Sequence, residues 1–171
     1  MTLSIDDKEQ IKNILPKFRE SLKLFVNSPA ARGLDCYEED KDLSCSCAIS
    51  SHALGTLLER KGYSPSIIIG VYNDGKRPAE EITPDIINHC WVEVGGRIID
   101  LTASQFNKKE NDIVFIPTEN SGKKFIPIIR TSVKNMKKDV IDWPTSQVPS
   151  LRNTRHILRN YQDLTGENVG A

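Results

Sequence analysis

The sequence predicts an α+β domain in which helices pack against one face of an antiparallel β-sheet. Apolar residues recur at helical spacing in three segments, and short apolar or alternating runs lie between the second and the third. The dipeptide Gly95-Gly96 separates two of these runs, which is typical of a two-residue β-hairpin. The 171 residues are enough for one domain with its own core.

The first helix is expected over residues 6–26, where the apolar positions follow helical spacing: Ile11, Ile14, Leu15, Phe18, Leu22 and Phe25. Pro16 lies inside this pattern and is expected to kink or split the helix, because proline removes a backbone hydrogen bond. Residues 27–46 are polar and aperiodic, so we interpret them as a surface loop.

The second helix is expected to begin at Cys47, with a buried stripe made of Ser50, Ala53, Leu54, Leu57 and Leu58. Ser44 or Ser46 can serve as its N-cap, and Gly62 is placed to cap its C-terminus. A third helix is expected over residues 151–164, where the apolar pattern is weaker.

The strands are expected between the second and third helices. An apolar run at 66–72 indicates a buried strand that ends at turn residues. Residues 89–94 and 97–101 form the two strands of the hairpin, and further strands are expected at 113–116 and 125–129.

The hairpin also predicts which side chains share a face. With a two-residue loop, Val94 faces Arg97, and strand alternation follows from that pair. One face then holds His89, Trp91, Glu93, Ile98, Asp100 and Thr102. The opposite face is almost wholly apolar and is interpreted as core: Cys90, Val92, Val94, Ile99 and Leu101. His89 and Asp100 become a diagonal cross-strand pair, in which the carboxylate can orient the imidazole.

Cys47 is the candidate nucleophile. Unpaired N–H groups and the macrodipole at a helix start favour an anion, so we expect the pKa of this thiol to be lowered. A nearby imidazole would form a thiolate–imidazolium pair with it, and cysteine, histidine and aspartate in this order fit a triad for acyl transfer. Taken singly, His89 and Cys47 also have ordinary structural interpretations. The combination of Cys47, His89 and Asp100 favours a catalytic role over a structural one.

The charge balance argues against nucleic-acid binding. The chain has 23 basic and 23 acidic residues, so its formal net charge is zero. The distribution is uneven: residues 121–171 carry nine Lys/Arg and four Asp/Glu, a net of +5, and residues 1–120 carry −5. Two interpretations remain open, namely two solvated faces, or a basic C-terminal region that binds an acidic protein partner or a phosphate backbone.

The N-terminus is acidic, unlike a signal peptide, and no stretch approaches the apolar length of a membrane span. We expect a cytoplasmic protein, or one exported without a conventional signal peptide, and no disulfide framework among the four cysteines. A zinc site using Cys45, Cys47, His89 and Cys90 is an alternative, but the spacing between Cys45 and Cys47 is unusually tight. We expect neither a metal nor a cofactor.

Two segments resemble the transglutaminase-like branch of papain-fold cysteine enzymes, which includes bacterial transglutaminase-like cysteine peptidases and the leader peptidases of lasso-peptide pathways. In the family a cysteine opens a helix, a glycine ends it fifteen residues later, and a strand ending in Gly-Val follows, as from Cys47 through Gly62 to Val71. The run from His89 to Val94, followed by Asp100-Leu101-Thr102, resembles the family's His-x-Trp-Val-Glu-Val and Asp-x-Thr segments.

The resemblance implies Cys47 as nucleophile, His89 as general base and then acid, and Asp100 as the orienting carboxylate. We expect Trp91 to cover the imidazole pair or to pack in the core, and Ser46 to support Cys47. The chain departs from the family pattern next to the nucleophile. The family often has a glycine near the cysteine, and papain-type enzymes have a tryptophan after it, whereas Ser46 and Ala48 flank Cys47 here.

Papain-type enzymes use a glutamine upstream of the nucleophile as a donor to the oxyanion. The only glutamine before Cys47 is Gln10, which lies far away in the first helix. We therefore expect the backbone N–H of Cys47 to be the oxyanion donor. Cys45 remains a rival nucleophile.

We therefore expect a single transglutaminase-like domain over residues 1–171, with its core at 27–130, a helical segment at 1–26 and a basic extension at 131–171. The expected function is hydrolysis of amide bonds in a protein or peptide substrate, as a peptidase, isopeptidase or glutamine deamidase. An acyltransferase with an amine acceptor and a non-catalytic papain-like binding module remain alternatives.

Overall fold

The computed structural model describes residues 2–32, 43, 46–73, 75, 78, 81, 83, 87–106, 111–136 and 150–170. Within these residues the α+β prediction is confirmed, with three α-helices and a five-stranded sheet. The helices are α1 (Ile5–Val26), α2 (Cys47–Arg60) and α4 (Leu151–Thr165). The strands are β1 (Ser66–Tyr72), β2 (His89–Val94), β3 (Arg97–Asp100), β4 (Val114–Pro117) and β5 (Phe125–Thr131).

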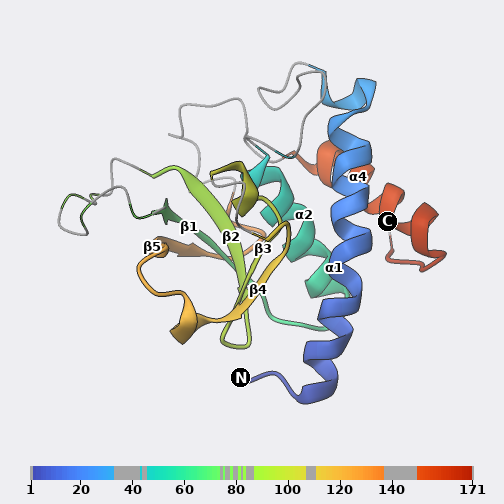
Figure 1. The fold of residues 1–171 in the computed structure, drawn as a ribbon. Helices are drawn as coiled ribbons and strands as arrows, with labels where there is room; N and C mark the ends of the chain where they lie inside the picture. The colour runs from blue at the N-terminus through green and yellow to red at the C-terminus, as the bar shows by residue number, and fades with distance from the viewer. Residues whose placement is uncertain are drawn as a thin grey trace.

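The sheet has the strand order β4-β3-β2-β1-β5, and every neighbouring pair is antiparallel. The helices lie together on one side of it (Figure 1). Helix α2 packs directly on β2 and β1, α4 packs on α2, and α1 packs on α4. The helix that begins with Cys47 is therefore the one in direct contact with the strand that begins with His89.

Helix α1 runs through Pro16 without a break, so the expectation that this proline splits the helix is wrong. Pro16 is exposed, on the solvent side of the helix, where water can satisfy the carbonyl that loses its N–H partner. The opposite side of α1 is buried. A capping box starts the helix, in which Ser4 accepts the N–H of Asp7 and the Asp7 carboxylate accepts the N–H of Ser4.

Helix α2 ends at Arg60, and Gly62 follows its C-cap as the sequence indicates. This glycine has a φ of +87°, in the left-handed region that favours glycine. Its N–H donates to the Glu59 carbonyl, and the N–H of Tyr63 donates to the Leu58 carbonyl, both at 3.0 Å. These two bonds form a Schellman motif and stop the helix directly before the chain enters β1.

The predicted hairpin register is confirmed. Val94 pairs with Arg97, and Glu93 pairs with Ile98. Gly95 and Gly96 both have positive φ, +53° and +76°, which a tight two-residue hairpin turn requires. Since the register is the predicted one, the faces assigned to the hairpin side chains also hold.

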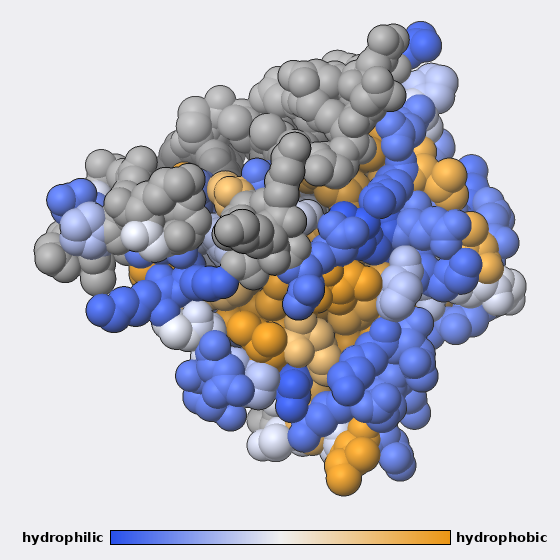
Figure 2. All heavy atoms as spheres, in the orientation of Figure 1, coloured by the Kyte–Doolittle hydropathy of each residue, from blue (hydrophilic) through white to orange (hydrophobic). Residues whose placement is uncertain are grey.

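Both faces of the sheet are buried. The core between the sheet and the helices includes the hairpin side chains that the sequence assigns to it: Cys90, Val92, Val94, Ile99 and Leu101. A smaller cluster covers the other face: Ile68, Tyr72, Trp91, Ile98, Ala103, Val114 and Phe125. Figure 2 shows apolar side chains in the middle of this view, beside the hydrophilic side chains of α1. Among the described helices, none has the length and apolar composition needed to span a bilayer.

Candidate active site

Cys47 is the first residue of α2 and is buried. Ser46 occupies the N-cap position, but its hydroxyl donates to the Leu43 carbonyl at 2.6 Å rather than capping the helix. The expected serine side-chain cap is therefore wrong for Ser46, and Ser44 lies outside the described residues. Ser46 instead closes the turn that leads into the helix.

His89 and Asp100 meet as the hairpin geometry predicts. Nε2 of His89 lies 2.6 Å from Oδ2 of Asp100, and both side chains are almost fully buried. The second carboxylate oxygen, Oδ1, accepts the backbone N–H of Thr102 at 2.8 Å and the Thr102 hydroxyl at 3.0 Å. Both oxygens of Asp100 are thus engaged, which fixes the carboxylate and, through it, the plane of the imidazole.

The other nitrogen of the His89 ring, Nδ1, is buried and has no partner at ordinary hydrogen-bond geometry. The thiol of Cys47 acts on the same ring. Burial by itself lowers the pKa of His89, but the charge and hydrogen bond of Asp100, followed by the Cys47 thiolate, raise it to about 10. The ring is therefore a stable imidazolium when Cys47 is ionised.

The Cys47 thiol is correspondingly acidic. A hydrogen bond from the Cys90 thiol lowers its pKa, burial opposes this, and the His89 imidazolium lowers the pKa further, to well below its ordinary value. The backbone N–H of Cys90 acts in the same direction. Cys90, which the sequence places simply on the apolar face, therefore contributes to the lowered pKa of the candidate nucleophile. A thiolate–imidazolium pair follows from these interactions.

Aromatic rings enclose the imidazole. The ring of Phe106 stands edge-on to His89 with centroids 4.9 Å apart, and the rings of Tyr72 and Trp91 lie 5.9 and 6.0 Å away. Trp91 lies beside the imidazole and is packed in the smaller core. Sequence analysis missed Tyr72, because the pairing of β1 with β2 that brings it there has no local signal.

Gly70 makes room for this arrangement. It pairs with His89 across β1 and β2, and a Cβ at this position would lie 2.8 Å from the Trp91 ring and 2.2 Å from the backbone oxygen of Ile126. No side chain fits there without moving β5 or the indole. The glycine of the Gly-Val pair at the end of this strand therefore has a packing role next to the histidine.

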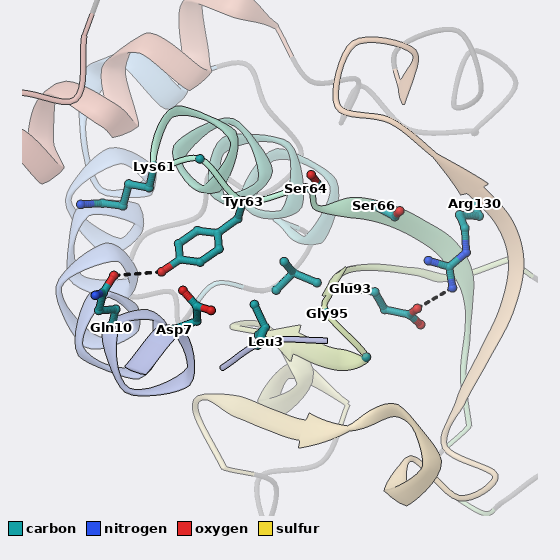
Figure 3. A pocket seen from close by; sticks show the side chains of 13 residues that line it. Leu3, Asp7, Gln10, Lys61, Tyr63, Ser64, Ser66, Glu93, Gly95 and Arg130 are labelled. Atoms are coloured by element: carbon teal, nitrogen blue, oxygen red, sulfur yellow. Dashed lines mark hydrogen bonds and ion pairs between the residues drawn. The ribbon is translucent and has the colours of Figure 1, made fainter. Parts of the chain in front are cut away.

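A separate pocket of about 350 Å³ lies at the far end of the hairpin, beside Gly95-Gly96. Figure 3 shows Tyr63 bonded to Gln10 on one side of it and the Glu93–Arg130 ion pair on the other. None of the candidate catalytic side chains lines this pocket. Its link to the site is indirect, because Glu93 also accepts the indole N–H of Trp91 at 3.4 Å.

Other residues singled out in the sequence lie elsewhere. His52 is buried between α2 and α4, with Nδ1 2.7 Å from the Thr154 hydroxyl, which is a structural contact. Cys36 and Cys45 lie outside the described residues, so the rival nucleophile and the zinc alternative stay untested there. Among the residues that the structure describes, no three His, Cys, Asp or Glu side chains form a group that could hold a metal ion.

The structure is an α+β domain in which a cysteine at the start of a helix packs on an antiparallel sheet that presents a histidine, an arrangement consistent with a transglutaminase-like core. Residues 30–109 match the model of the transglutaminase-like superfamily, so this part of the chain is similar to that superfamily. The matched segment includes all three candidate catalytic residues. Searches of curated proteins and of solved structures found no match.

Proposed function

We propose that the protein is a cysteine-dependent hydrolase of amide bonds in protein or peptide substrates, with Cys47, His89 and Asp100 as its catalytic residues. The observation that supports this most directly is the His89 ring, in which Asp100 holds one nitrogen while the other is buried, unbonded and next to the Cys47 thiol. An imidazole between a carboxylate and a thiolate can carry a proton between the sulfur and a substrate nitrogen.

In the first half of the proposed reaction, the Cys47 thiolate attacks the amide carbonyl carbon and forms a C–S bond. The carbonyl oxygen takes up the negative charge, and the backbone N–H of Cys47 is the proposed donor to it. The C–N bond then breaks as His89 gives its Nδ1 proton to the leaving nitrogen. The products are a free amine or ammonia, a thioester on Cys47 and a neutral imidazole.

In the second half, a water molecule attacks the thioester carbon and gives a proton to Nδ1 of His89. The C–S bond breaks, the acid is released, and the thiolate–imidazolium pair is restored. Asp100 holds the ring in one orientation through both halves. No step needs a cofactor, and a reducing compartment such as the cytoplasm would keep the nucleophile as a thiol.

The test incubates the chain with glutamine-containing peptides and follows cleavage, ammonia release and incorporation of an added primary amine by mass spectrometry. Hydrolysis that requires Cys47 and is lost in Cys47→Ala supports the proposal. Incorporation of the amine in preference to water would assign acyl transfer instead. Full activity in Cys47→Ala, or a thioester trapped on Cys45, would overturn the assignment of the nucleophile.

As part of this proposal, the exposed face of α4 binds an acidic segment of a protein partner or of the substrate. Arg152, Arg155 and Arg159 are exposed at helical spacing and, with His156, line a surface pocket of about 230 Å³. Within the described part of the chain, none of the three arginines has an acidic partner. We expect the affinity for an acidic peptide to fall with added salt and to fall in Arg155→Ser. An affinity that changes neither with salt nor in Arg155→Ser would refute this part of the proposal.

A further inference from the structure

Arg19 is a buried cation on α1, the helix that precedes the matched segment. Of the Lys and Arg side chains in the described part of the chain, it is the only buried one, with 7% of its surface exposed. Burying a charge is costly unless the charge is paired and hydrogen-bonded. The partners of this side chain therefore indicate what it holds in place.

The guanidinium of Arg19 donates in two directions. Its Nε donates to the buried carbonyl of Leu101 at 3.4 Å, and its Nη2 donates to Oδ1 of Asp112 at 2.8 Å. Leu101 directly follows β3, and Asp112 lies shortly before β4. Figure 1 shows α1 running beside these two strands. One side chain from α1 thus ties the end of β3 to the approach to β4.

These two attachments flank the position of Asp100. Asp100 is the last residue of β3 and pairs with Val114 of β4. The carbonyl that Arg19 holds belongs to the next residue along the chain, Leu101. The N–H of the same peptide group is that of Thr102, which donates to Oδ1 of Asp100 at 2.8 Å. Arg19 therefore binds one end of the peptide group whose other end binds the carboxylate.

We propose that Arg19 is a positioning residue of the site, which aims the Thr102 N–H at the Asp100 carboxylate. The peptide group is planar, so fixing its carbonyl also fixes the direction of its N–H. A donor on the carbonyl also polarises the peptide group and strengthens its N–H as a donor. The inference rests on the proposed function, because it gives α1 a task in holding the carboxylate that orients His89.

The test measures hydrogen exchange of the Thr102 amide by NMR in the free protein. Arg19→Met keeps an unbranched stem but has no donor, so we expect this amide to exchange about tenfold faster or more. The loss of a hydrogen bond from a charged group is large enough for that change, because it frees the peptide group to turn. The proton between Nε2 of His89 and Asp100 should give a downfield resonance that weakens in the same variant.

Leu22→Ala is the matched control for a loss of stability. Leu22 is buried in the core on the same helix, so its truncation destabilises the packing of α1 without removing a donor. Exchange of Thr102 is expressed relative to the amides of β2, the middle strand, which report global unfolding. This ratio should rise in Arg19→Met and stay at the parental value in Leu22→Ala. An unchanged ratio in Arg19→Met, or an equal rise in Leu22→Ala, would overturn the proposal.

Asp112→Asn is the control for the ion pair. It removes the charged partner of Arg19 but leaves the Nε donor to Leu101, so the exchange of Thr102 should stay close to that of the parent. A rise as large as in Arg19→Met would assign the effect to the ion pair and would contradict the proposed role of the Leu101 carbonyl.

If Arg19→Met does not fold, the folded parent decides. The peptide group cannot turn while Arg19 holds its carbonyl, so the Thr102 amide should be protected at least as strongly as the Nε proton of Arg19. A Thr102 amide that exchanges tenfold faster than that proton, each relative to its intrinsic rate, would refute the inference. None of these readouts uses a substrate, so absent amide hydrolysis together with faster Thr102 exchange in Arg19→Met would count against the proposed function alone.

Discussion

Two buried histidines lie in contrasting surroundings. His89, at the start of β2, faces the Asp100 carboxylate and the Cys47 thiol, and these partners overcome the effect of burial to raise its pKa to about 10. His52, between α2 and α4, has a threonine hydroxyl as its partner, and burial lowers its pKa. Both rings lose their water, so the charge of the partner decides whether a buried imidazole is protonated. Of these two rings, His89 has a carboxylate as its hydrogen-bond partner and His52 has a hydroxyl.

The contrast predicts very different effects for the two histidine-to-alanine variants. In His89→Ala, amide hydrolysis should fall by about 10³-fold, the middle of the range for a lost general acid–base, and alkylation of Cys47 at pH 6 should slow. His52→Ala should leave both rates near those of the parent once the fraction of folded protein is matched by circular dichroism. Equal losses in the two variants would break the comparison.

Replacing the carboxylate should make His89 resemble His52. In Asp100→Asn, the ring loses its charged partner while the amide keeps a similar shape, so the pKa of His89 should fall from about 10 towards or below its ordinary value. Hydrolysis should fall by roughly 10²-fold or more, because the ring is no longer held in one orientation. NMR titration of the His89 ring measures the pKa, and an unchanged value would show that Cys47 alone keeps the ring charged.

The two histidines should also shape the pH dependence of stability in opposite directions. His89 has a raised pKa in the folded state, so its contribution is full below about pH 6.5 and is lost as the pH rises towards about 10. His52 has a lowered pKa, so it costs nothing at high pH, and stability falls as the pH drops below about 6.5.

Urea denaturation across this pH range tests both signs. His52→Gln should remove part of the loss at acid pH, and His89→Gln should remove part of the loss at alkaline pH. If either substitution changed the opposite limb of the profile, the assignment of charge to the two rings would be wrong.

Local patterns were enough to predict one part of the site. The Gly95-Gly96 loop sets the register of the hairpin, and alternation then places His89 beside Asp100. No long-range information is needed for that pair. The start of α2 at Cys47 is likewise local, since it follows from helical periodicity and from a glycine at the other end.

The remaining parts depend on how distant elements pack. The effect of Cys90 on the pKa of Cys47 follows from the position of α2 on β2, and the place of Tyr72 beside His89 follows from the pairing of β1 with β2. Periodicity reports which face of an element is apolar, but it does not report which element meets that face. For that reason Cys90 looked like an ordinary core thiol in the sequence.

The smallest predicted effects come from the two threonines that serve the two rings. Thr102→Val removes the hydroxyl bond to Asp100 but keeps the backbone N–H bond at 2.8 Å, so hydrolysis should fall only several-fold and stability by about 1 kcal/mol. Thr154→Val removes the one hydrogen bond that the structure gives the His52 ring, so stability should fall by about 1–3 kcal/mol.

These two isosteric changes distinguish the region of His89 from the region of His52, because one is expected to affect activity and the other stability. Thr102→Val should lower activity more than its effect on folding explains, because Asp100 gains freedom to turn away from His89. Thr154→Val should lower the midpoint of urea denaturation while the activity of the folded protein stays at the parental level. A loss of activity in folded Thr154→Val would mean that the packing of α2 on α4 transmits strain to Cys47 at the start of the same helix, and the two histidine regions would then be coupled.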